Sequence, residues 1–127
     1  MPRLEGIAPI VPVQDEGVTL AFYRDVLGFE VRVHAPENRY ALVARDEAAV
    51  ALLGGADAAA LRATASNISA YIWVADLDAL WAELEPALAA LPKGRVRAPF
   101  VQGYGMREFH VKDPDGFLIF FGEDAGG

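Results

Sequence analysis

A hairpin pattern near the C-terminal end of the sequence limits most strongly what this chain can fold into. Along residues 106–112 apolar and polar side chains alternate, with Phe109 and Val111 on the apolar side, as in a strand with two unlike faces. An Asp-Pro-Asp-Gly turn follows at 113–116, where proline presets φ and glycine accepts a positive φ. Residues 117–121 are then apolar on both faces, as in a fully covered strand. The hairpin therefore has one polar-lined strand, and this lining faces either solvent or a ligand.

The order of predicted elements that ends in this hairpin occurs twice in the chain. A strand, a helix and three strands are predicted within about residues 5–55, and the same order is predicted within about residues 67–122. Sequence identity between the halves is low, so the repeat is one of pattern. The alanine-rich residues 56–66 are interpreted as a linker between the two modules, with room for a helical turn. At 127 residues, we expect both modules to form one domain.

Prolines bear on the form of two of the predicted elements. Pro9 and Pro12 lie in the first predicted strand, residues 7–13, and cannot donate to a sheet ladder. This strand is therefore expected at a sheet edge or with a bulge. Pro86 lies in the second predicted helix, and because it removes a backbone donor it is expected to kink or break that helix near residues 84–85.

The composition argues against several classes of protein. The 54% hydrophobic content is unlike that of disordered chains, and no apolar stretch approaches the ~20 residues that a membrane-spanning helix needs. The formal net charge of −7, from 18 acidic and 11 basic residues, argues against nucleic acid as a partner. The N-terminal residues lack the apolar segment of a signal peptide, so we expect a cytoplasmic protein. The absence of cysteine excludes disulfides and thiolate metal sites.

Three segments carry a resemblance to a known family. They are Leu-Ala-Phe-Tyr-Arg-Asp-Val-Leu-Gly-Phe at 20–29, Val-Ala-Asp-Leu-Asp-Ala-Leu-Trp at 74–81 and Arg-Glu-Phe-His-Val-Lys-Asp-Pro-Asp-Gly at 107–116. These segments resemble the vicinal oxygen chelate superfamily, which includes glyoxalase I, extradiol dioxygenases, fosfomycin resistance proteins and bleomycin resistance proteins. The segments most similar to the bleomycin resistance branch are residues 8–12, 71–74 and 107–109.

The resemblance implies an α+β fold with two βαβββ modules, which form a curled mixed sheet around a cleft with the helices outside. It also implies a homodimer, because in many members of the superfamily the cleft draws residues from both chains. Bleomycin resistance proteins sequester a small molecule, so similarity to that branch implies small-molecule binding and a part in antibiotic resistance.

The resemblance also identifies the positions at which the superfamily's enzymes hold a divalent metal. There is one on the first strand and one on the last strand of each module. In this sequence the equivalent positions are Ala8, Leu53 (or Leu52 in the alternative register), Ser69 and Phe120. Three of the four offer no donor atom, and a serine hydroxyl is a poor substitute for the His, Gln or Glu that such cations prefer. We therefore expect neither a metal nor another cofactor.

Aromatic and polar side chains that remain on the inward faces form a candidate binding site. Strand parity places Tyr71 and Trp73 on the side of their strand that faces away from the helix. Parity places Glu108 and His110 opposite the apolar side of theirs. Ring faces attract a stacked ring or a cation, and the glycine-containing residues 102–105 could close over the entrance. The candidate ligand-binding residues are Tyr71, Trp73, Tyr104, Glu108, His110, Leu118 and Phe120.

Other interpretations of these side chains stay open at the level of sequence. Tyr71 and Trp73 would also suit a dimer interface or the filling of a collapsed cleft. Glu108 would also suit a surface ion pair with Arg107 or Lys112. A cleft filled in this way would indicate a dimerisation scaffold.

Two function classes fit the candidate site. In the first, the chain is a metal-free binder that sequesters an aromatic or cationic compound in the dimer cleft. In the second, it is a divergent enzyme of the superfamily (a lyase, isomerase or oxidoreductase) that uses His110 and Glu108 on a small substrate. The missing metal donors favour the binder, whereas an inward His–Glu pair keeps the enzyme as the alternative.

Overall fold

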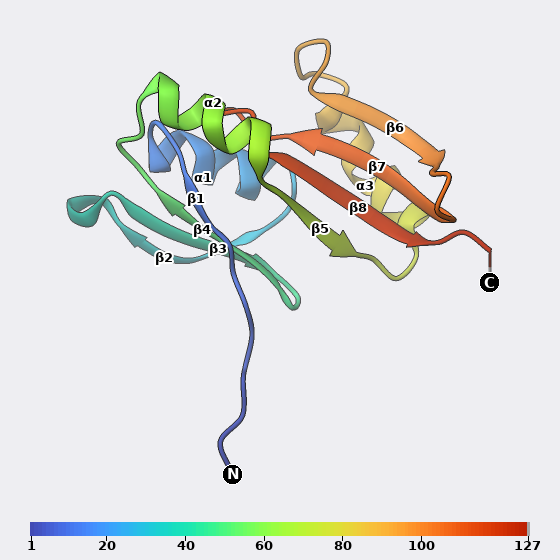
Figure 1. Cartoon of the computed structure of the whole chain (residues 1–127), viewed down its shortest axis with the longest axis horizontal. Coiled ribbons are helices and arrows are strands. Elements are labelled where there is room, and N and C mark those ends of the chain that lie inside the picture. The colour runs from blue at the N-terminus through green and yellow to red at the C-terminus, as the bar shows by residue number, and fades with distance from the viewer. Residues whose placement is uncertain (127) are drawn as a thin grey trace.

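The computed structural model describes residues 1–126 and contains two four-stranded sheets, one from each half of the chain (Figure 1). The first half contains β1 (Ile10–Pro12), α1 (Glu16–Asp25), β2 (Glu30–Ala35), a 3-10 turn (Pro36–Asn38), β3 (Tyr40–Arg45) and β4 (Ala48–Leu53). The second half contains β5 (Ser69–Trp73), α3 (Leu77–Leu88), β6 (Val96–Val101), β7 (Met106–Lys112) and β8 (Leu118–Asp124). One further helix, α2 (Ala58–Asn67), joins the two halves.

Both sheets have the same topology. The strand order is β1-β4-β3-β2 in the first and β5-β8-β7-β6 in the second. In each sheet the first strand pairs parallel with the last strand, and the remaining pairs are antiparallel. The α+β fold with two βαβββ modules of mixed sheet is therefore confirmed.

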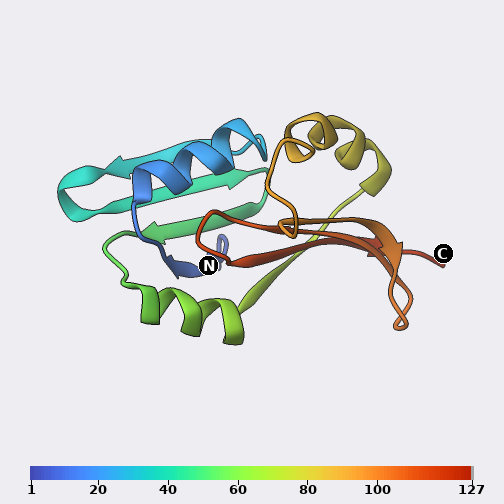
Figure 2. The ribbon, with the colours of Figure 1, turned by 90° about the horizontal axis from the view of Figure 1, so that it is seen from above.

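The helices α1 and α3 cover the same side of the two sheets, as the view from above shows (Figure 2). Helix α1 contacts β2, β3 and β4, and helix α3 contacts β7 and β8. Helix α2 lies on the opposite side, against β1. No described helix is long and apolar enough to cross a membrane. The arrangement leaves most of one face of each sheet without a helix, and this face points toward the viewer in Figure 1.

The hydrophobic core lies between the helices and the covered faces of the sheets. Phe109 stacks on Phe121 with ring centroids 4.8 Å apart, and Trp81 of α3 lies 5.1 Å from Phe109. Each fully buried large apolar side chain contributes about 1.5–3 kcal/mol relative to its exposed state. The strand side chains in this core cluster are Val11, Ala41, Val43, Val50, Leu52, Phe109, Val111, Ile119 and Phe121. Alternate side chains of β3, β7 and β8 therefore point into the core, whereas the edge strands β2 and β6 contribute none of these residues.

The turn at residues 113–116 joins the second module to the first. Its Asp113 is fully buried and accepts hydrogen bonds from the backbone N–H groups of Asp115 and Phe117 and from the Tyr23 hydroxyl of α1, at 2.9, 3.0 and 3.3 Å. Thr19 of α1 donates to Asp115 at 2.9 Å. Burial is the largest influence on Asp113 and raises its pKa to about 6, against the lowering effect of these hydrogen bonds.

A second link between the modules is the ion pair of Arg45 and Glu83. The guanidinium donates to both carboxylate oxygens, at 2.7 and 2.8 Å, from the end of β3 to the middle of α3. Arg45 also donates to the backbone carbonyl of Leu27 at 3.1 Å. A side chain at Gly28, where φ is +75°, would lie 2.8 Å from the guanidinium, so glycine makes room for this pair.

The first strand is shorter than predicted. Pairing with β4 is confined to Ile10–Pro12, whereas residues 7–13 were expected to form the strand. Pro9 contributes only its carbonyl, which accepts from the Ala51 N–H at 2.9 Å, because proline has no N–H to donate. Residues before the strand run away from the body of the protein (Figure 1). The predicted position at a sheet edge is confirmed by the strand order.

Two other expectations from the sequence need correction. Residues 56–66 do link the modules, but in place of the single helical turn considered they mostly form α2, which begins where Asp57 accepts from the Ala60 N–H at 2.9 Å. A run of alanines has the highest helix propensity, and the N-cap supplies a start signal. Pro86 does not break α3, because it lies in the last turn and the flanking Leu84 and Leu88 are both buried in the core. Their packing offsets the loss of one helical hydrogen bond.

Candidate functional site

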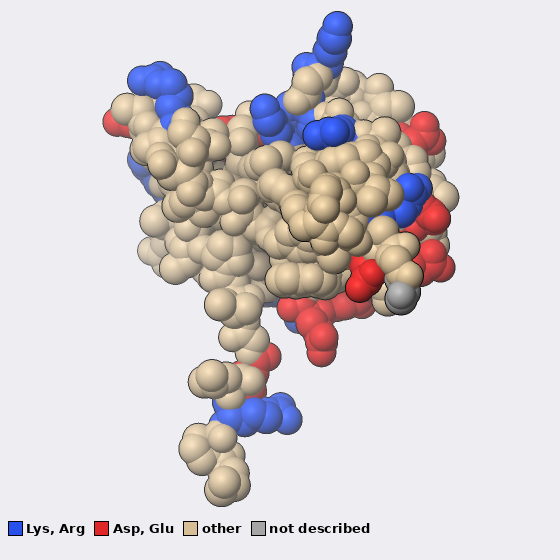
Figure 3. All heavy atoms as spheres, turned by 45° about the vertical axis from the view of Figure 1, so that its right-hand side comes forward, with Lys and Arg blue, Asp and Glu red and all other residues tan. Residues whose placement is uncertain are grey.

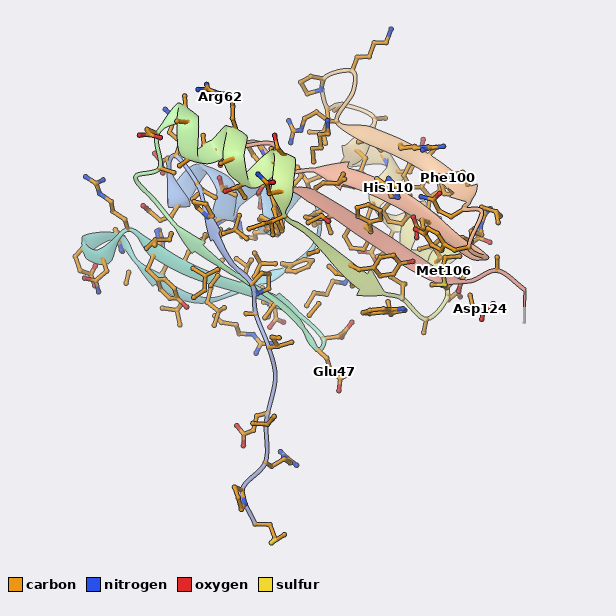
Figure 4. All side chains as sticks on the ribbon, viewed as in Figure 1. Glu47, Arg62, Phe100, Met106, His110 and Asp124 are labelled. Carbon is orange, nitrogen blue, oxygen red and sulfur yellow. The ribbon has the colours of Figure 1, made fainter. Side chains whose placement is uncertain are left out.

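The uncovered face of the second sheet carries the side chains of interest. On β7, Phe109 and Val111 point into the core, and Glu108 and His110 lie on the other face, as predicted. Residues directly opposite in an antiparallel pair share a face. Glu108 lies opposite Gly122 and Phe100, and His110 lies opposite Phe120 and Arg97. Figure 4 shows His110 and Phe100 side by side on β7 and β6.

Glu108 is the centre of a hydrogen-bond network on this face. Its side chain has no exposed surface. One carboxylate oxygen contacts His110 Nε2 at 2.7 Å and Gln102 Nε2 at 3.1 Å. The other accepts from the hydroxyls of Tyr71, at 2.8 Å, and of Tyr104. Burial by itself raises the pKa of Glu108, but the hydrogen bonds from its four partners outweigh burial and lower the pKa to about 2.

These contacts exclude the surface ion pair considered for Glu108. Arg107 points to the other face of β7 and pairs with Asp78 of α3 at 2.9 Å. Glu108 is instead an ionised carboxylate held under the aromatic side chains of its own sheet. Such a group is stable away from water only when its lone pairs are satisfied, and here four donors satisfy them.

Gly122 makes this network possible, and the sequence reasoning missed it. A Cβ at position 122 would collide with the Tyr71 hydroxyl and lie 2.7 Å from Cζ of the same ring. The absence of a side chain therefore lets Tyr71 lie flat across β8 and reach Glu108. A glycine inside a strand is a known signal of such close approach, and it was the one clue available in the sequence.

The rings on this face form a continuous row. Trp73 lies 4.8 Å from Tyr71, and Tyr71 lies 5.8 Å from Phe120, between ring centroids. Phe120 lies 4.1 Å from His110, which lies 5.1 Å from Phe100. Trp73, at one end of this row, and Tyr104, which contacts Glu108, remain 75% and 61% exposed, so their rings are open to a partner.

The structure thus brings together six of the seven predicted ligand-binding residues through direct contacts. The seventh, Leu118, is on the same face, where it pairs with Lys112 and Ser69 at the far end of β8. Phe100 and Gln102 also belong to the cluster and were not predicted. Phe100 follows an irregularity in β6 that puts it on the same face as Arg97, three residues away, whose guanidinium carbon lies 3.5 Å from the Phe100 ring centroid. Strict alternation would have placed the two on opposite faces.

A separate cleft opens between the two modules. It has a volume of about 440 Å³, and the residues that line it include Phe29, Arg45, Trp73, Asp76, Leu80 and Glu83. Of the seven predicted residues only Trp73 reaches it. The others lie on an open face, which Figure 3 shows as a broad area with few charged side chains and with charges mainly at its margins. Enclosure of this face within a dimer cleft therefore depends on a second chain.

The residues at the superfamily's metal positions do not fit a metal. Leu53 is half-exposed on the uncovered face and Leu52 is fully buried beneath α1, so Leu53 is the inward residue of β4. Together with Ala8, Ser69 and Phe120 it supplies one hydroxyl. Within residues 1–126 no group of three His, Cys, Asp or Glu side chains is placed to hold a metal ion.

The comparisons with known proteins agree with this architecture. A family model described as the Glyoxalase/Bleomycin resistance protein/Dioxygenase superfamily matches residues 6–121. A bleomycin-binding protein from bleomycin-producing Streptomyces verticillus, solved with copper(II)-bleomycin, is 30% identical, with a TM-score of 0.75 over 100% of both chains. No protein among the curated sequences matches this chain.

Two further solved structures share the fold. One is a bleomycin-binding protein complexed with bleomycin, at 23% identity and a TM-score of 0.76, covering 95% of this chain and 99% of that one. The other is a bleomycin resistance determinant encoded on the transposon Tn5, at 20% identity and a TM-score of 0.73, covering 95% and 98%.

Proposed function

The chain belongs to the glyoxalase/bleomycin resistance protein/dioxygenase superfamily, and from that premise we propose that it is a metal-free small-molecule-binding protein. It sequesters an aromatic or cationic compound in a cleft that a second copy of the chain completes, and so confers resistance to that compound within the cytoplasm. The observation that carries this proposal is the row of rings on the second sheet from Trp73 to Phe100, together with the exposed rings of Trp73 and Tyr104. Exposed ring faces that are fixed from below are suited to stacking.

The same network argues against Glu108 as a general acid or base. A general acid or base has to reach the substrate, directly or through one water. Both oxygens of Glu108 are instead occupied by side chains of the protein, and the carboxylate has no exposed surface. His110 keeps one free ring nitrogen, and Glu108, which holds the other nitrogen, can orient the ring but cannot itself exchange a proton with a substrate.

The proposed dimer is supported by apolar side chains left uncovered on both sheets. Trp73 of the second module is 75% exposed, and Ile10 and Leu53 of the first module are 71% and 46% exposed. A second chain placed over these faces would remove this apolar surface from water and enclose the row of rings. Light scattering at micromolar concentration is expected to give twice the 13.7 kDa mass of one chain. A monomeric mass would leave the face open and contradict the enclosed cleft.

The binding site is tested by a fluorescence titration with copper(II)-bleomycin and with metal-free bleomycin. The chain has two tryptophans, and one of them, Trp81, lies in the core against Phe109. The Trp81→Phe variant therefore leaves Trp73 as the single tryptophan. In this background ligand binding is expected to change the emission of Trp73. Trp73→Ala and Tyr71→Ala, followed by calorimetry, are each expected to weaken binding about 10-fold or more, since one stacked ring contributes about 0.5–1.5 kcal/mol beyond the area it buries. Unchanged affinity in both variants would place the site elsewhere.

A further inference from the structure

The hydrogen bonds around Glu108 determine which polar groups this face can offer to a ligand. Resting on the proposed function, we infer that Glu108 is a positioning residue that turns its four partners into hydrogen-bond acceptors toward the ligand. The ligand that fits is then a planar aromatic molecule that carries N–H donors at its edge. Glu108 acts through these partners, because its own oxygens are enclosed.

The first step is the direction of each hydrogen bond. An ionised carboxylate can only accept, so every partner of Glu108 has to donate to it. The hydroxyls of Tyr71 and Tyr104 therefore point their protons at one oxygen, and the Gln102 amide points its NH₂ group at the other. His110 donates from Nε2, at 2.7 Å from the same oxygen as Gln102.

The second step is what remains on each partner. In the tautomer with its proton on Nε2, His110 keeps a lone pair on Nδ1, and Gln102 keeps its carbonyl oxygen. The two tyrosine hydroxyls keep lone pairs as well. The four side chains around Glu108 therefore present acceptors, where the same residues without the carboxylate could present donors.

The third step is whether a ligand can reach these atoms. Among the described residues Arg95 Nη2 is the one buried side-chain polar atom without a partner, so Nδ1 of His110 and the carbonyl oxygen of Gln102 keep contact with solvent. Neither atom has a hydrogen-bond partner within residues 1–126. Trp73 and Tyr104 are exposed beside them and offer the ring faces on which a flat molecule can stack.

The charged groups on this face favour donors over net positive charge. Arg97, whose guanidinium lies over Phe100, and Lys112, which lies beyond His110, oppose a cation near them. Asp124 at the end of β8 (Figure 4) and the enclosed Glu108 attract one. A neutral N–H donor gains the hydrogen bonds without the repulsion. Donor content, more than charge, is therefore expected to decide affinity.

Four planar probes of one size test this inference. Two of the probes carry N–H donors: 2-naphthamide, which is neutral, and 2-naphthamidine, which is cationic. The other two carry none: methyl 2-naphthoate, which is neutral, and 2-naphthoate, which is an anion. Calorimetry on the full chain is expected to show 2-naphthamide binding at least 10-fold more tightly than methyl 2-naphthoate. The amidine is expected to bind within about threefold of the amide, and the carboxylate no better than the ester.

The Glu108→Gln variant separates positioning from simple structural support. The amide at this position has one accepting oxygen and one NH₂ group, so at least one partner has to reverse its hydrogen bond. The preference for amide over ester is expected to fall below threefold, while the ester keeps its affinity within threefold because the rings stay in place. Asp124→Asn makes the same carboxylate-to-amide change on the same face and is expected to keep the full preference.

The protonated nitrogen of His110 gives an independent measurement without any ligand. At pH 8 a long-range ¹⁵N correlation spectrum of the wild type is expected to show the proton on Nε2, and Glu108→Gln is expected to change the pattern. A proton on Nδ1 in the wild type would overturn the inference. Equal affinities for amide and ester, in binding that Trp73→Ala weakens, would overturn it while leaving the proposed function intact. Absence of binding by all four probes, or binding that Trp73→Ala leaves unchanged, would overturn both.

Discussion

The two modules share one topology but present different chemistry on their uncovered faces. In the first sheet this face is mainly aliphatic, with Ile10, Leu53 and Val33 exposed on it. In the second sheet the face holds a row of rings around an enclosed carboxylate, Glu108. Strand order and burial toward the helices are alike in both. The topology therefore follows from the apolar alternation that the modules share, and the proposed function follows from side chains that the alternation leaves free.

Among the substitutions considered, one that fills the space beneath Tyr71 is expected to disrupt the uncovered face of the second sheet most strongly. Gly122→Ala places a methyl group where the Tyr71 ring lies, so the ring has to move and its hydrogen bond to Glu108 is broken. A lost hydrogen bond to a charged group and the steric strain together are expected to cost about 3–5 kcal/mol. Urea unfolding measures the change, and binding of the copper(II)-bleomycin probe should be lost as well.

Gly103→Ala is the matched control for that substitution. Gly103 lies in the turn that carries Tyr104, and a Cβ there would meet nothing within 4 Å. Its free energy of unfolding is expected to stay within about 0.5 kcal/mol of the wild type. An equally small effect of Gly122→Ala would contradict the placement of Tyr71 across β8.

The acid stability of the protein is expected to depend on Glu108, which has no counterpart on the first sheet. Because its pKa is about 2 in the folded protein and 4.5 in the reference state, its contribution is complete above pH 4.5 and is lost as the pH falls toward 2. The contribution is at most about 3 kcal/mol. Glu108→Gln should lack this decline, so the two free energies of unfolding are expected to converge between pH 4.5 and 2. Parallel pH curves for the two proteins would contradict the lowered pKa.

The carboxyl group of Asp113 is expected to give the opposite pH dependence, with the free energy of unfolding falling as the pH rises. Its pKa is about 6 in the folded protein and 3.8 in the reference state, so the folded protein holds a proton that the unfolded chain releases between these values. The contribution of this carboxyl is complete below pH 3.8 and is lost as the pH rises through 6, by about 2–3 kcal/mol. Asp113→Asn keeps the turn's acceptor oxygen and should remove this decline. A wild-type decline that persists unchanged in the variant would assign it to another group.

The ion pair between the modules is expected to have the smallest effect. Glu83 is about half exposed, and such pairs typically contribute about 0–1 kcal/mol. Glu83→Gln should therefore change the free energy of unfolding by less than about 1 kcal/mol, and salt should reduce the difference further. A loss above 2 kcal/mol would show that this pair, and not the buried turn at Asp113, holds the modules together.

Much of this architecture could be predicted because alternation is a local property of the sequence. The opposed faces of β7 follow from Phe109 and Val111, and the edge position of β1 follows from its prolines. Contacts between strands are a different matter, because they depend on register. The close approach of Tyr71 to Gly122 required the parallel pairing of β5 with β8, which no single strand encodes.

The enclosure of Glu108 could not be predicted for the same reason. Its four partners come from β5, β7 and the turn between β6 and β7, and no pairwise pattern in the sequence joins them. Phe100 was missed because an irregularity in β6 shifts the alternation after Arg97. Pro86 shows the reverse case, where packing of the flanking leucines overrides the local signal, whereas the alanines and the N-cap of α2 were a local signal that the prediction underrated.

An NMR titration of the ¹⁵N-labelled chain with copper-free bleomycin tests most directly whether the second module's uncovered face is the binding surface. The account predicts the largest shift changes at the indole N–H of Trp73, at the ring nitrogens of His110 and at the backbone of residues 102–105. Residues of the Arg45–Glu83 cleft other than Trp73 should change little. Shifts confined to that cleft or to β2 and β3, with His110 and the 102–105 turn unchanged, would contradict it.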